Sequence, residues 1–318
     1  MNEPKTLVDA IRFFADPDVC LDMMVKLRWP NGVACPTCGS MDVSFISTRR
    51  IWKCKADHAK RQFSVKVGTI FEDSPMSLDK WLTAIWLITN AKNGVSSYEI
   101  ARDLGVTQKS AWFMMHRIRT AMDTESSDKF SGKVEVDETF IGGKARFMHK
   151  DKRAEKIHGT GGMGKTAVMG LLERHGPDND GSRVRTKVVA DRRRGTLSTE
   201  VRQRVTAGSE VFTDALKSYN DLSDEYIHQV IDHAEEYVRG QVHTNGIENF
   251  WSLLKRAIKG TYVNVEPFHL FRYLDEESFR YNTRHTDDAT RFTKVAKGVT
   301  GKRLTYAQLT GGAVTTPA

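Results

Sequence analysis

The sequence predicts an α/β protein in which a mixed sheet flanked by helices occupies the C-terminal half of the chain. Three observations predict this fold class. From residue 133, short apolar runs are separated first by turns alone and later by helical segments. Before them, from residue 77 to about residue 122, apolar residues recur at helical spacing. Ahead of both regions, residues 31–72 are rich in glycine, cysteine and β-favouring residues.

The composition narrows the class of protein. The 318 residues include 48 Lys and Arg and 40 Asp and Glu, which gives a formal net charge of +8. Such an excess favours a polyanionic partner such as nucleic acid, although a merely basic soluble protein has it too. The sequence has no apolar run of about 18 residues, so we expect no membrane-spanning helix. We expect no export signal either, and therefore a cytoplasmic protein with reduced cysteines.

The chain divides into five predicted segments, and the polar, Ser-rich stretch 124–132 marks the main boundary. The segments are a helical lead-in (1–30), a ribbon (31–72), a helical region with a helix-turn-helix (73–123), the α/β domain (133–290) and a C-terminal tail (291–318) that we expect to be frayed from residue 299. In the α/β domain, strands are predicted within the runs 133–142 (up to Asp137), 166–174, 183–190, 210–214 and 225–231, and helices at 196–206, 215–222, 245–259 and 266–282.

Two turns of the ribbon carry side chains that bind metal. A Cys-x-x-Cys turn followed by Gly is separated by residues 39–53 from a Cys and His pair, a spacing within the usual range for zinc sites. Thiolates suit tetrahedral zinc, and His can replace one of them. We predict a structural zinc ion bound by Cys35, Cys38, Cys54 and His58. Of the four ligands, His58 is the one that the spacing specifies least strictly. The alternative interpretation is that the cysteines are buried free thiols that bind no metal.

Residues 96–122 have the pattern of a helix-turn-helix. Ser96 and Glu99 form a capping box, Gly105 permits a sharp turn, and a second helix follows from residue 108. Basic and amide side chains occupy the positions of this helix that would face a DNA groove. We predict DNA contacts from Gln108, Lys109, Ser110, His116 and Arg117. An ordinary helical hairpin without DNA contacts has the same pattern.

One nucleotide-binding pattern lacks its structural context. Residues 159–166 fit G-x-x-x-x-G-K-[ST], which needs a buried strand before it and a helix after it. The preceding residues are strongly charged and the following AVMGLLER is strand-like, so we reject a P-loop. The surrounding segment 144–165 is rich in Lys and Arg. It predicts either a mobile basic loop that orders on DNA or an ordinary solvated loop.

Three acidic side chains of the α/β domain can meet at the strand ends. Asp137 and Asp214 each end a predicted strand, and Glu248 opens a helix. Such hard oxygen ligands suit two magnesium or manganese ions placed for in-line attack at phosphorus. Each acid also has a local interpretation as a turn former or helix cap. Asp191 and Asp232 lie at comparable positions, so spacing alone does not decide among the five.

The helix that carries Glu248 has a basic edge. Lys255 lies two turns after Glu248 on the same face, where its ammonium group can hold a phosphate as a point charge. Arg256 and Lys259 extend this edge, and we predict that both bind DNA.

At these residues the sequence resembles the zinc-ribbon DDE transposases of bacterial insertion sequences, the ISXO2-like family. The resemblance covers about residues 20–290 and rests on motifs in the same order, among them CPTCGS, WKCKADH, VEVDETFIGGK, VFTDALKSYN and HTNGIENFWSLLKRAIKGTY. It implies an RNase H-like catalytic fold with a triad at Asp137, Asp214 and Glu248 and with Lys255 as the downstream basic residue. Many relatives have a second Cys-x-x-Cys where this chain has Cys54 and His58.

The resemblance implies transposition of an insertion sequence. We expect magnesium-dependent cleavage at the element ends and 3′-hydroxyl strand transfer to target DNA, in the nucleoid region of a bacterial cytoplasm. The expected partners are double-stranded DNA (terminal inverted repeats and target) and further copies of the chain in a homodimer or higher synaptic oligomer. Three alternatives keep the same motifs. One is a metal-dependent nuclease without joining activity, another is a DNA-binding regulator with an inactive catalytic domain, and the third is a domesticated, inactive relic of the family.

Overall fold

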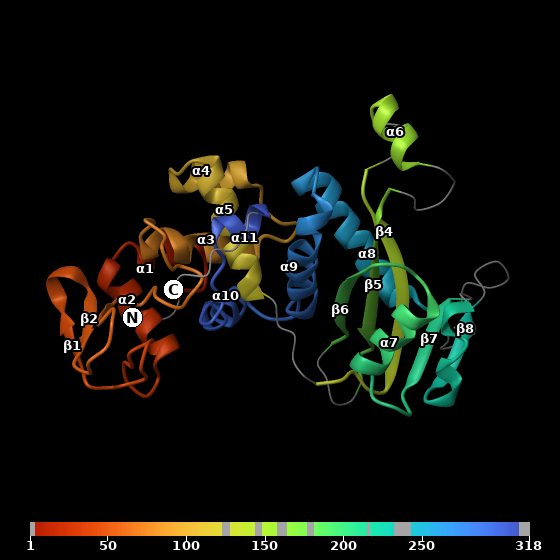
Figure 1. The fold of residues 1–318 in the computed structure, drawn as a ribbon, viewed down its shortest axis with the longest axis horizontal. Helices are drawn as coiled ribbons and strands as arrows, with labels where there is room; N and C mark the ends of the chain where they lie inside the picture. Colours follow the sequence, from red (N-terminus) through yellow and green to blue (C-terminus); the bar gives the residue numbers. More distant parts are fainter. Residues whose placement is uncertain are drawn as a thin grey trace. The chain divides into compact units, whose positions relative to one another are not determined.

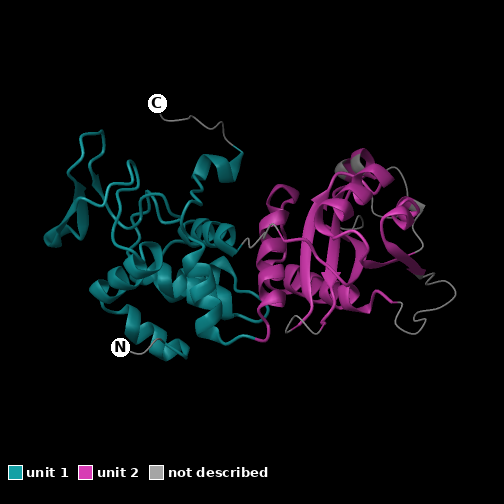
Figure 2. Cartoon of the chain, turned by 90° about the horizontal axis from the view of Figure 1, so that it is seen from below, with its two compact units in different colours: residues 1–123, 286–318 teal, residues 124–285 magenta. Residues whose placement is uncertain are grey.

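The chain forms two compact units (Figure 2), unit 1 from residues 1–123 and 286–318 and unit 2 from residues 124–285. The computed structural model describes residues 4–122, 128–143, 148–157, 164–176, 181–214, 217–231 and 243–311. Within these ranges, every helix is too short or too polar to cross a membrane.

Unit 1 combines a small antiparallel ribbon, β1-β2-β3, with a group of helices (Figure 1). Its predicted helical stripe is confirmed, because α3 buries Trp81, Leu82, Ile85 and Ile88. The elements of unit 1 are α1 (Leu7–Phe14), α2 (Pro17–Arg28), β1 (Val43–Ile46), β2 (Ile51–Cys54), β3 (Gln62–Phe63), α3 (Leu78–Asn90), α4 (Ser97–Leu104), α5 (Gln108–Met122), α10 (Asp288–Lys297) and α11 (Tyr306–Thr310).

Helices α4 and α5 are joined by a sharp turn. The predicted capping box is present, since the Glu99 backbone amide donates to Ser96 Oγ and the Ser96 amide donates to the Glu99 carboxylate. Gly105 adopts a left-handed conformation with φ 60°, which costs a residue with a side chain about 1 kcal/mol or more. Beyond its first turns α5 is buried on nearly all sides, so it forms the centre of unit 1.

The residues after 285 pack into unit 1. The Phe292 ring of α10 lies 5.3 Å from the Phe14 ring and 5.4 Å from the Trp86 ring, measured between centroids. Three later apolar side chains are also buried: Val299, Leu304 and Leu309. The expectation of fraying from residue 299 is therefore wrong as far as residue 311, because these side chains find an apolar surface that their local sequence does not reveal.

Unit 2 is built around a five-stranded sheet of order β6-β5-β4-β7-β8. Strands β4, β5 and β6 form an antiparallel meander, and β4, β7 and β8 run parallel. This confirms the predicted meander followed by alternating helices and strands. The elements are β4 (Lys133–Ile141), α6 (Lys150–Lys156), β5 (Thr166–Glu173), β6 (Arg183–Val189), α7 (Arg194–Arg204), β7 (Glu210–Asp214), β8 (Ile227–Ile231), α8 (Asn245–Ala257) and α9 (Leu270–Asn282).

Helices cover both faces of this sheet, with α7 on one face and α8 on the other (Figure 1). The alternation along β4 decides which side chain meets which helix. Val134 and Val136 pack in the core with α7. Glu135 and Asp137 point the other way and bond to residues of α8, so the acidic face of β4 lies under that helix.

Two segments of unit 2 differ from the prediction. In place of a helix over 215–222, the described residues form two short 3₁₀ turns, Lys217–Tyr219 and Leu222–Asp224, because Asn and Asp between them favour turns over helix. The predicted basic loop contains helix α6, built from the good helix formers Lys, Arg, Ala and Glu. Residues 144–147 and 158–163 of that loop lie outside the described residues.

Candidate functional site

Asp137 and Asp214 lie on neighbouring parallel strands. Strand β4 pairs with β7 as far as Glu135 and Phe212, so Asp137 and Asp214 each lie two residues beyond that pair. Strand β7 ends there, whereas β4 continues in its antiparallel pairing with β5. The expectation that Asp137 ends its strand is therefore wrong, since β5 supplies hydrogen-bond partners for the rest of β4.

Burial and neighbouring charges raise the pKa of Asp137 to about 6. Desolvation is the largest cause, and repulsion from the carboxylates of Asp214 and Glu248 adds to it. The Trp251 indole N–H donates to Asp137 Oδ2 over 2.9 Å. This hydrogen bond stabilises the carboxylate and so lowers the pKa of Asp137, against the other two causes. Asp214 and Glu248 therefore both lie within electrostatic reach of Asp137.

Gly170 of β5 makes room for that tryptophan. It is the cross-strand partner of Asp137, and a Cβ atom at this position would lie 2.6 Å from two ring carbons of Trp251. The bare backbone lets the indole lie against the sheet beside Asp137, so strand β5 and helix α8 together fix the orientation of the carboxyl group.

Glu248 lies in the first turn of α8 and is exposed. Its carboxylate accepts a hydrogen bond from Thr244 Oγ1 over 2.9 Å, a contact between two side chains and not the helix cap that the sequence left open. Among the described residues, the compact group of metal-ligand side chains is in the ribbon and not at these carboxylates.

Glu138 is a further acid at this site, and the sequence analysis missed it. Burial raises its pKa to about 8, and repulsion from Asp214 and Asp137 adds to the shift, whereas Arg192 opposes it. The buried Tyr219 hydroxyl donates to Glu138 Oε1. Two consecutive acids, Asp137 and Glu138, within a predicted strand were the available signal.

The basic edge of α8 adjoins the acidic cluster. Partial burial lowers the pKa of Lys255, while attraction to Asp137 raises it and repulsion from Lys259 and Lys165 lowers it. Arg256 and Lys259 are exposed. The ammonium group of Lys255 is thus close enough to Asp137 to act on the same bound group.

The alternatives left open by the sequence receive structural roles or lie outside the described residues. Asp191 accepts hydrogen bonds from the Arg193 backbone amide and the Thr196 hydroxyl, so it stabilises the start of α7. Asp232 is not among the described residues. Thr166, at the end of the rejected P-loop pattern, begins strand β5 and not a helix, which agrees with the rejection.

The ribbon brings its four predicted ligands together. The ligand atoms of Cys35, Cys38, Cys54 and His58 all lie within 4.8 Å of one another. His58 Nδ1 is hydrogen-bonded to the Ala59 backbone carbonyl over 2.6 Å. Because a carbonyl only accepts, Nδ1 carries the proton, and Nε2 is left facing Cys35 Sγ at 3.5 Å. A ligating histidine is held by such a contact, so His58 fits as the fourth ligand.

The first cysteine turn favours a thiolate. Burial alone would raise the pKa of Cys35, but the backbone amides of Cys38 and Thr37, and then the thiols of Cys38 and Cys54, lower it to about 6. Three sulfur ligands and one imidazole, arranged in this way, fit a structural zinc ion.

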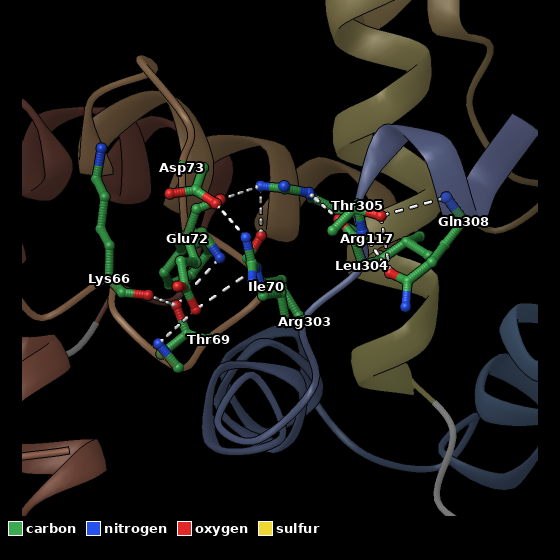
Figure 3. Close-up of polar contacts among 12 residues, drawn as sticks. Lys66, Thr69, Ile70, Glu72, Asp73, Arg117, Arg303, Leu304, Thr305 and Gln308 are labelled. Atoms are coloured by element: carbon green, nitrogen blue, oxygen red, sulfur yellow. Dashed lines mark hydrogen bonds and ion pairs between the residues drawn. The ribbon is translucent and has the colours of Figure 1, made fainter. Parts of the chain in front are cut away.

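Arg117 of α5 is buried inside unit 1 (Figure 3). Its guanidinium group donates to the backbone carbonyls of Ile70, Glu72 and Leu304 over 3.0, 2.8 and 2.9 Å. It therefore joins α5 to the segment after the ribbon and to the returning C-terminal segment. His116 is fully buried as well. The expectation that His116 and Arg117 reach DNA is wrong, because α5 is surrounded on nearly all sides and has no polar face there.

The first turn of α5, unlike the rest of the helix, lies at the surface of unit 1. Lys109 is exposed, and its ammonium group lies 4.9 Å from the centre of the Tyr306 ring. Gln108 and Ser110 are half-buried and hydrogen-bonded to neighbouring side chains. Of the five side chains predicted to contact DNA from this helix, these three remain candidates.

Comparison with known proteins gives matches over both sites. Residues 129–282 match the family described as ISXO2-like transposase domain, and residues 16–59 match the transposase zinc-ribbon domain. The chain is 27% identical over 266 residues to an uncharacterized protein in transposable element ISH50 of Halobacterium salinarum, covering 77% of this chain and 84% of that protein. It is 33% identical over 101 residues to an uncharacterized transposase-like protein of Haemophilus influenzae, covering 31% of this chain and 81% of that protein.

The matches confirm the predicted RNase H-like fold class with a preceding zinc ribbon. They say nothing specific about the helix-turn-helix. One of the two relatives is archaeal, so the expected bacterial source remains a prediction.

Proposed function

Because the chain belongs to the ISXO2-like transposase family, we propose that it is the transposase of an insertion sequence. It cleaves DNA strands at the ends of the element and joins the freed 3′-hydroxyl groups to target DNA. The observation that carries this proposal is the arrangement of Asp137 and Asp214, each two residues beyond the last β4–β7 pair, beside helix α8, which bears Glu248 and contacts Asp137 through Trp251.

The three carboxylates suit two magnesium or manganese ions. Hard oxygen ligands are those that these ions prefer, and the repulsion at Asp137 is what a bound cation relieves. When bound, such ions supply Lewis-acid activation of the attacking oxygen and neutralise charge on the leaving oxygen. Asp137, Asp214 and Glu248 would hold them.

Other groups of unit 2 orient the reactants. The Trp251 indole holds the Asp137 carboxyl group in one orientation. The Lys255 ammonium group, within electrostatic reach of Asp137, binds a phosphate beside the scissile bond, and the exposed Arg256 and Lys259 bind neighbouring phosphates. Cleavage and joining are both in-line displacements at phosphorus that differ only in the attacking oxygen, so one set of groups serves both steps.

Unit 1 binds the terminal inverted repeats in this proposal. Gln108, Lys109 and Ser110 lie in the first turn of α5, which is where a recognition helix contacts base edges. The excess of positive charge supplies phosphate contacts along double-stranded DNA. Since an element has two ends, we expect a homodimer or higher synaptic oligomer on DNA.

Replacing each acid by its amide tests the catalytic assignment. We expect Asp137→Asn, Asp214→Asn and Glu248→Gln each to lower magnesium-dependent cleavage of an element end by roughly 1,000-fold or more, because each removes a ligand of the cations that stabilise the transition state. Binding of the end, measured by gel mobility shift, should stay unchanged. Asp191→Asn is the control, since Asp191 only caps α7. Retained cleavage in one of the three variants removes that residue from the site.

A strand-transfer assay separates this function from its rivals. A transposase links the 3′-end of the element to target DNA, whereas a nuclease releases cut ends only. A regulator with an inactive catalytic domain would bind the ends and show no magnesium-dependent cleavage.

A further inference from the structure

Glu135 and Arg174 form a buried ion pair at the start of α8. Arg174 Nε donates to Glu135 Oε1 over 2.7 Å, and the Ile247 backbone amide donates to Glu135 Oε2 over 2.8 Å. Glu135 is only 1% exposed. Arg174 Nη2 also donates to the backbone carbonyl of His243 over 2.5 Å. The Glu135 carboxylate on β4 thus accepts a hydrogen bond from a backbone amide in the first turn of α8. Its ion-pair partner, Arg174, holds the segment that leads into this helix.

Gly246 permits this close contact. A Cβ atom at Gly246 would lie 2.9 Å from Glu135 Oε2 and 3.1 Å from Oε1, closer than the two groups can come without displacement. The N-cap side chain, Thr244, accepts no hydrogen bond from the helix amides. Glu135 therefore supplies from the strand the acceptor that an N-cap residue usually supplies, and the position of α8 depends on β4.

The anchored positions adjoin two of the catalytic acids. Glu135 precedes Asp137 by two residues on the same face of β4, and Ile247 immediately precedes Glu248 in α8. Any shift of the helix at Ile247 moves Glu248 relative to Asp137. A misplacement of about 1 Å is enough to lower a catalytic rate by the order of 100-fold.

We propose that Glu135, together with Arg174, is a positioning residue that sets the separation of Glu248 from Asp137 and thereby the divalent-metal affinity of the site. The inference rests on the proposed function, because it takes the acids to be metal ligands. Glu135 itself touches neither DNA nor metal in this role. It acts through the Ile247 amide and the Arg174 side chain.

Mn²⁺ binding to a Glu135→Gln variant tests this role. The amide keeps an acceptor for the Ile247 N–H but loses the charge that holds Arg174. We expect the Mn²⁺ dissociation constant, measured without DNA from the electron paramagnetic resonance signal of free Mn²⁺, to rise about 10- to 100-fold. Gly246→Ala changes no ionisable group but displaces the Glu135 carboxylate, so we expect a rise in the same direction.

Glu173→Gln is the matched control. Glu173 is a buried glutamate of the same sheet, 3% exposed, with the same kinds of partner. It pairs with Arg183 over 2.6 Å and accepts the Ser131 backbone amide over 2.9 Å, and neither partner belongs to α8. Both glutamine variants should lose thermal stability, but only Glu135→Gln should lose Mn²⁺ affinity. Arg174→Lys, which keeps the charge, should retain more affinity than Arg174→Met.

Two results would overturn the positioning role while leaving the proposed function intact. One is wild-type Mn²⁺ affinity in both Glu135→Gln and Gly246→Ala. The other is an equal loss of affinity in Glu173→Gln, which would make the effect one of general destabilisation. If Glu135→Gln does not fold, the Mn²⁺ affinities of Gly246→Ala and of the two Arg174 variants test the positioning role in its place. Wild-type protein that binds Mn²⁺ no better than Asp137→Asn would refute the proposed function and this inference with it.

Discussion

At the scale of single residues, the burial of Asp137, together with repulsion from the neighbouring carboxylates of Asp214 and Glu248, lowers the stability of the fold. The pKa of Asp137 is about 6 in the folded protein against 3.8 for the unperturbed group. Between pH 4 and pH 6 the folded state keeps a proton that the unfolded state has released. The free energy of unfolding therefore falls as pH rises through this range, and it stays lower above it.

Asp137→Asn should remove the loss of unfolding free energy that the ionised Asp137 carboxylate causes. We expect the variant to raise the free energy of unfolding of the metal-free protein above pH 6 by up to about 3 kcal/mol, and to change it little near pH 4. The amide oxygen still accepts from Trp251, so that contact is kept. Urea unfolding at pH 4 and pH 7.5 measures the difference, and an equal effect at the two pH values would contradict the electrostatic cause. Added magnesium should narrow the gap by stabilising the wild-type protein.

Residue type and position near strand ends and a helix start left five candidate acids, and the family resemblance selected Asp137, Asp214 and Glu248 among them. The roles of Glu135 and Glu138 were not predictable, because each depends on a residue more than 80 positions away, Ile247 for the first and Tyr219 for the second. His116 and Arg117 were misread for a related reason. Helical periodicity shows which side of a helix is apolar, but it does not show how many neighbours surround the other sides.

At the scale of elements, the ribbon depends on its ligands more than on its strands. Strands β1, β2 and β3 have four, four and two residues, too few for a stable sheet by themselves. Trp52 is buried at their centre, stacked against Phe63 with ring centroids 6.1 Å apart. We therefore expect bound zinc to contribute most of the folding free energy of this element.

Removal of zinc should unfold the ribbon. We expect a chelator to shift tryptophan emission to longer wavelength, because Trp52 becomes exposed, and to release zinc measurable by elemental analysis. His58→Ala should lower zinc affinity, whereas His58→Cys should retain the ion with a fourth thiolate. Unchanged emission from a protein shown to have lost its zinc would contradict a structural role for the ion.

The strands of unit 2 were predictable because each is an apolar run bounded by turn residues. The segment 217–224 was not, since apolar residues in short 3₁₀ turns imitate one face of a helix. The start of α8 shows a further limit. Its anchoring acceptor comes from β4 and not from the N-cap position, so a search for local capping signals finds only part of what holds it.

At the scale of the whole molecule, unit 1 is made from both ends of the described chain, with the sequence of unit 2 inserted between them. Phe292, Val295 and Val299 recur at helical spacing, but that pattern does not show which surface they pack against. The sequence therefore predicted the strands of unit 2 well, but it did not predict that the residues after 285 belong to unit 1.

A chain ending at residue 285 should keep unit 2 and lose unit 1. It lacks the Phe292 ring that packs on Phe14 and Trp86 and the Leu304 carbonyl that accepts from Arg117. Deleting a buried Phe side chain alone costs about 3–5 kcal/mol. We expect loss of element-end binding, measured by gel mobility shift, with Mn²⁺ binding retained. Full end binding by the shortened chain would show that residues 286–311 are dispensable.

The inserted arrangement also orders events during protein synthesis. The ribosome translates residues 286–311 after all of unit 2, so a nascent chain cannot complete unit 1 until its catalytic half has already been made. In the proposed transposase, products of a premature stop codon or of proteolysis before residue 286 would lack a finished unit 1, which we expect to bind DNA, and would compete poorly for element ends. The ends would then be occupied mainly by full-length polypeptides that are equipped to cut them.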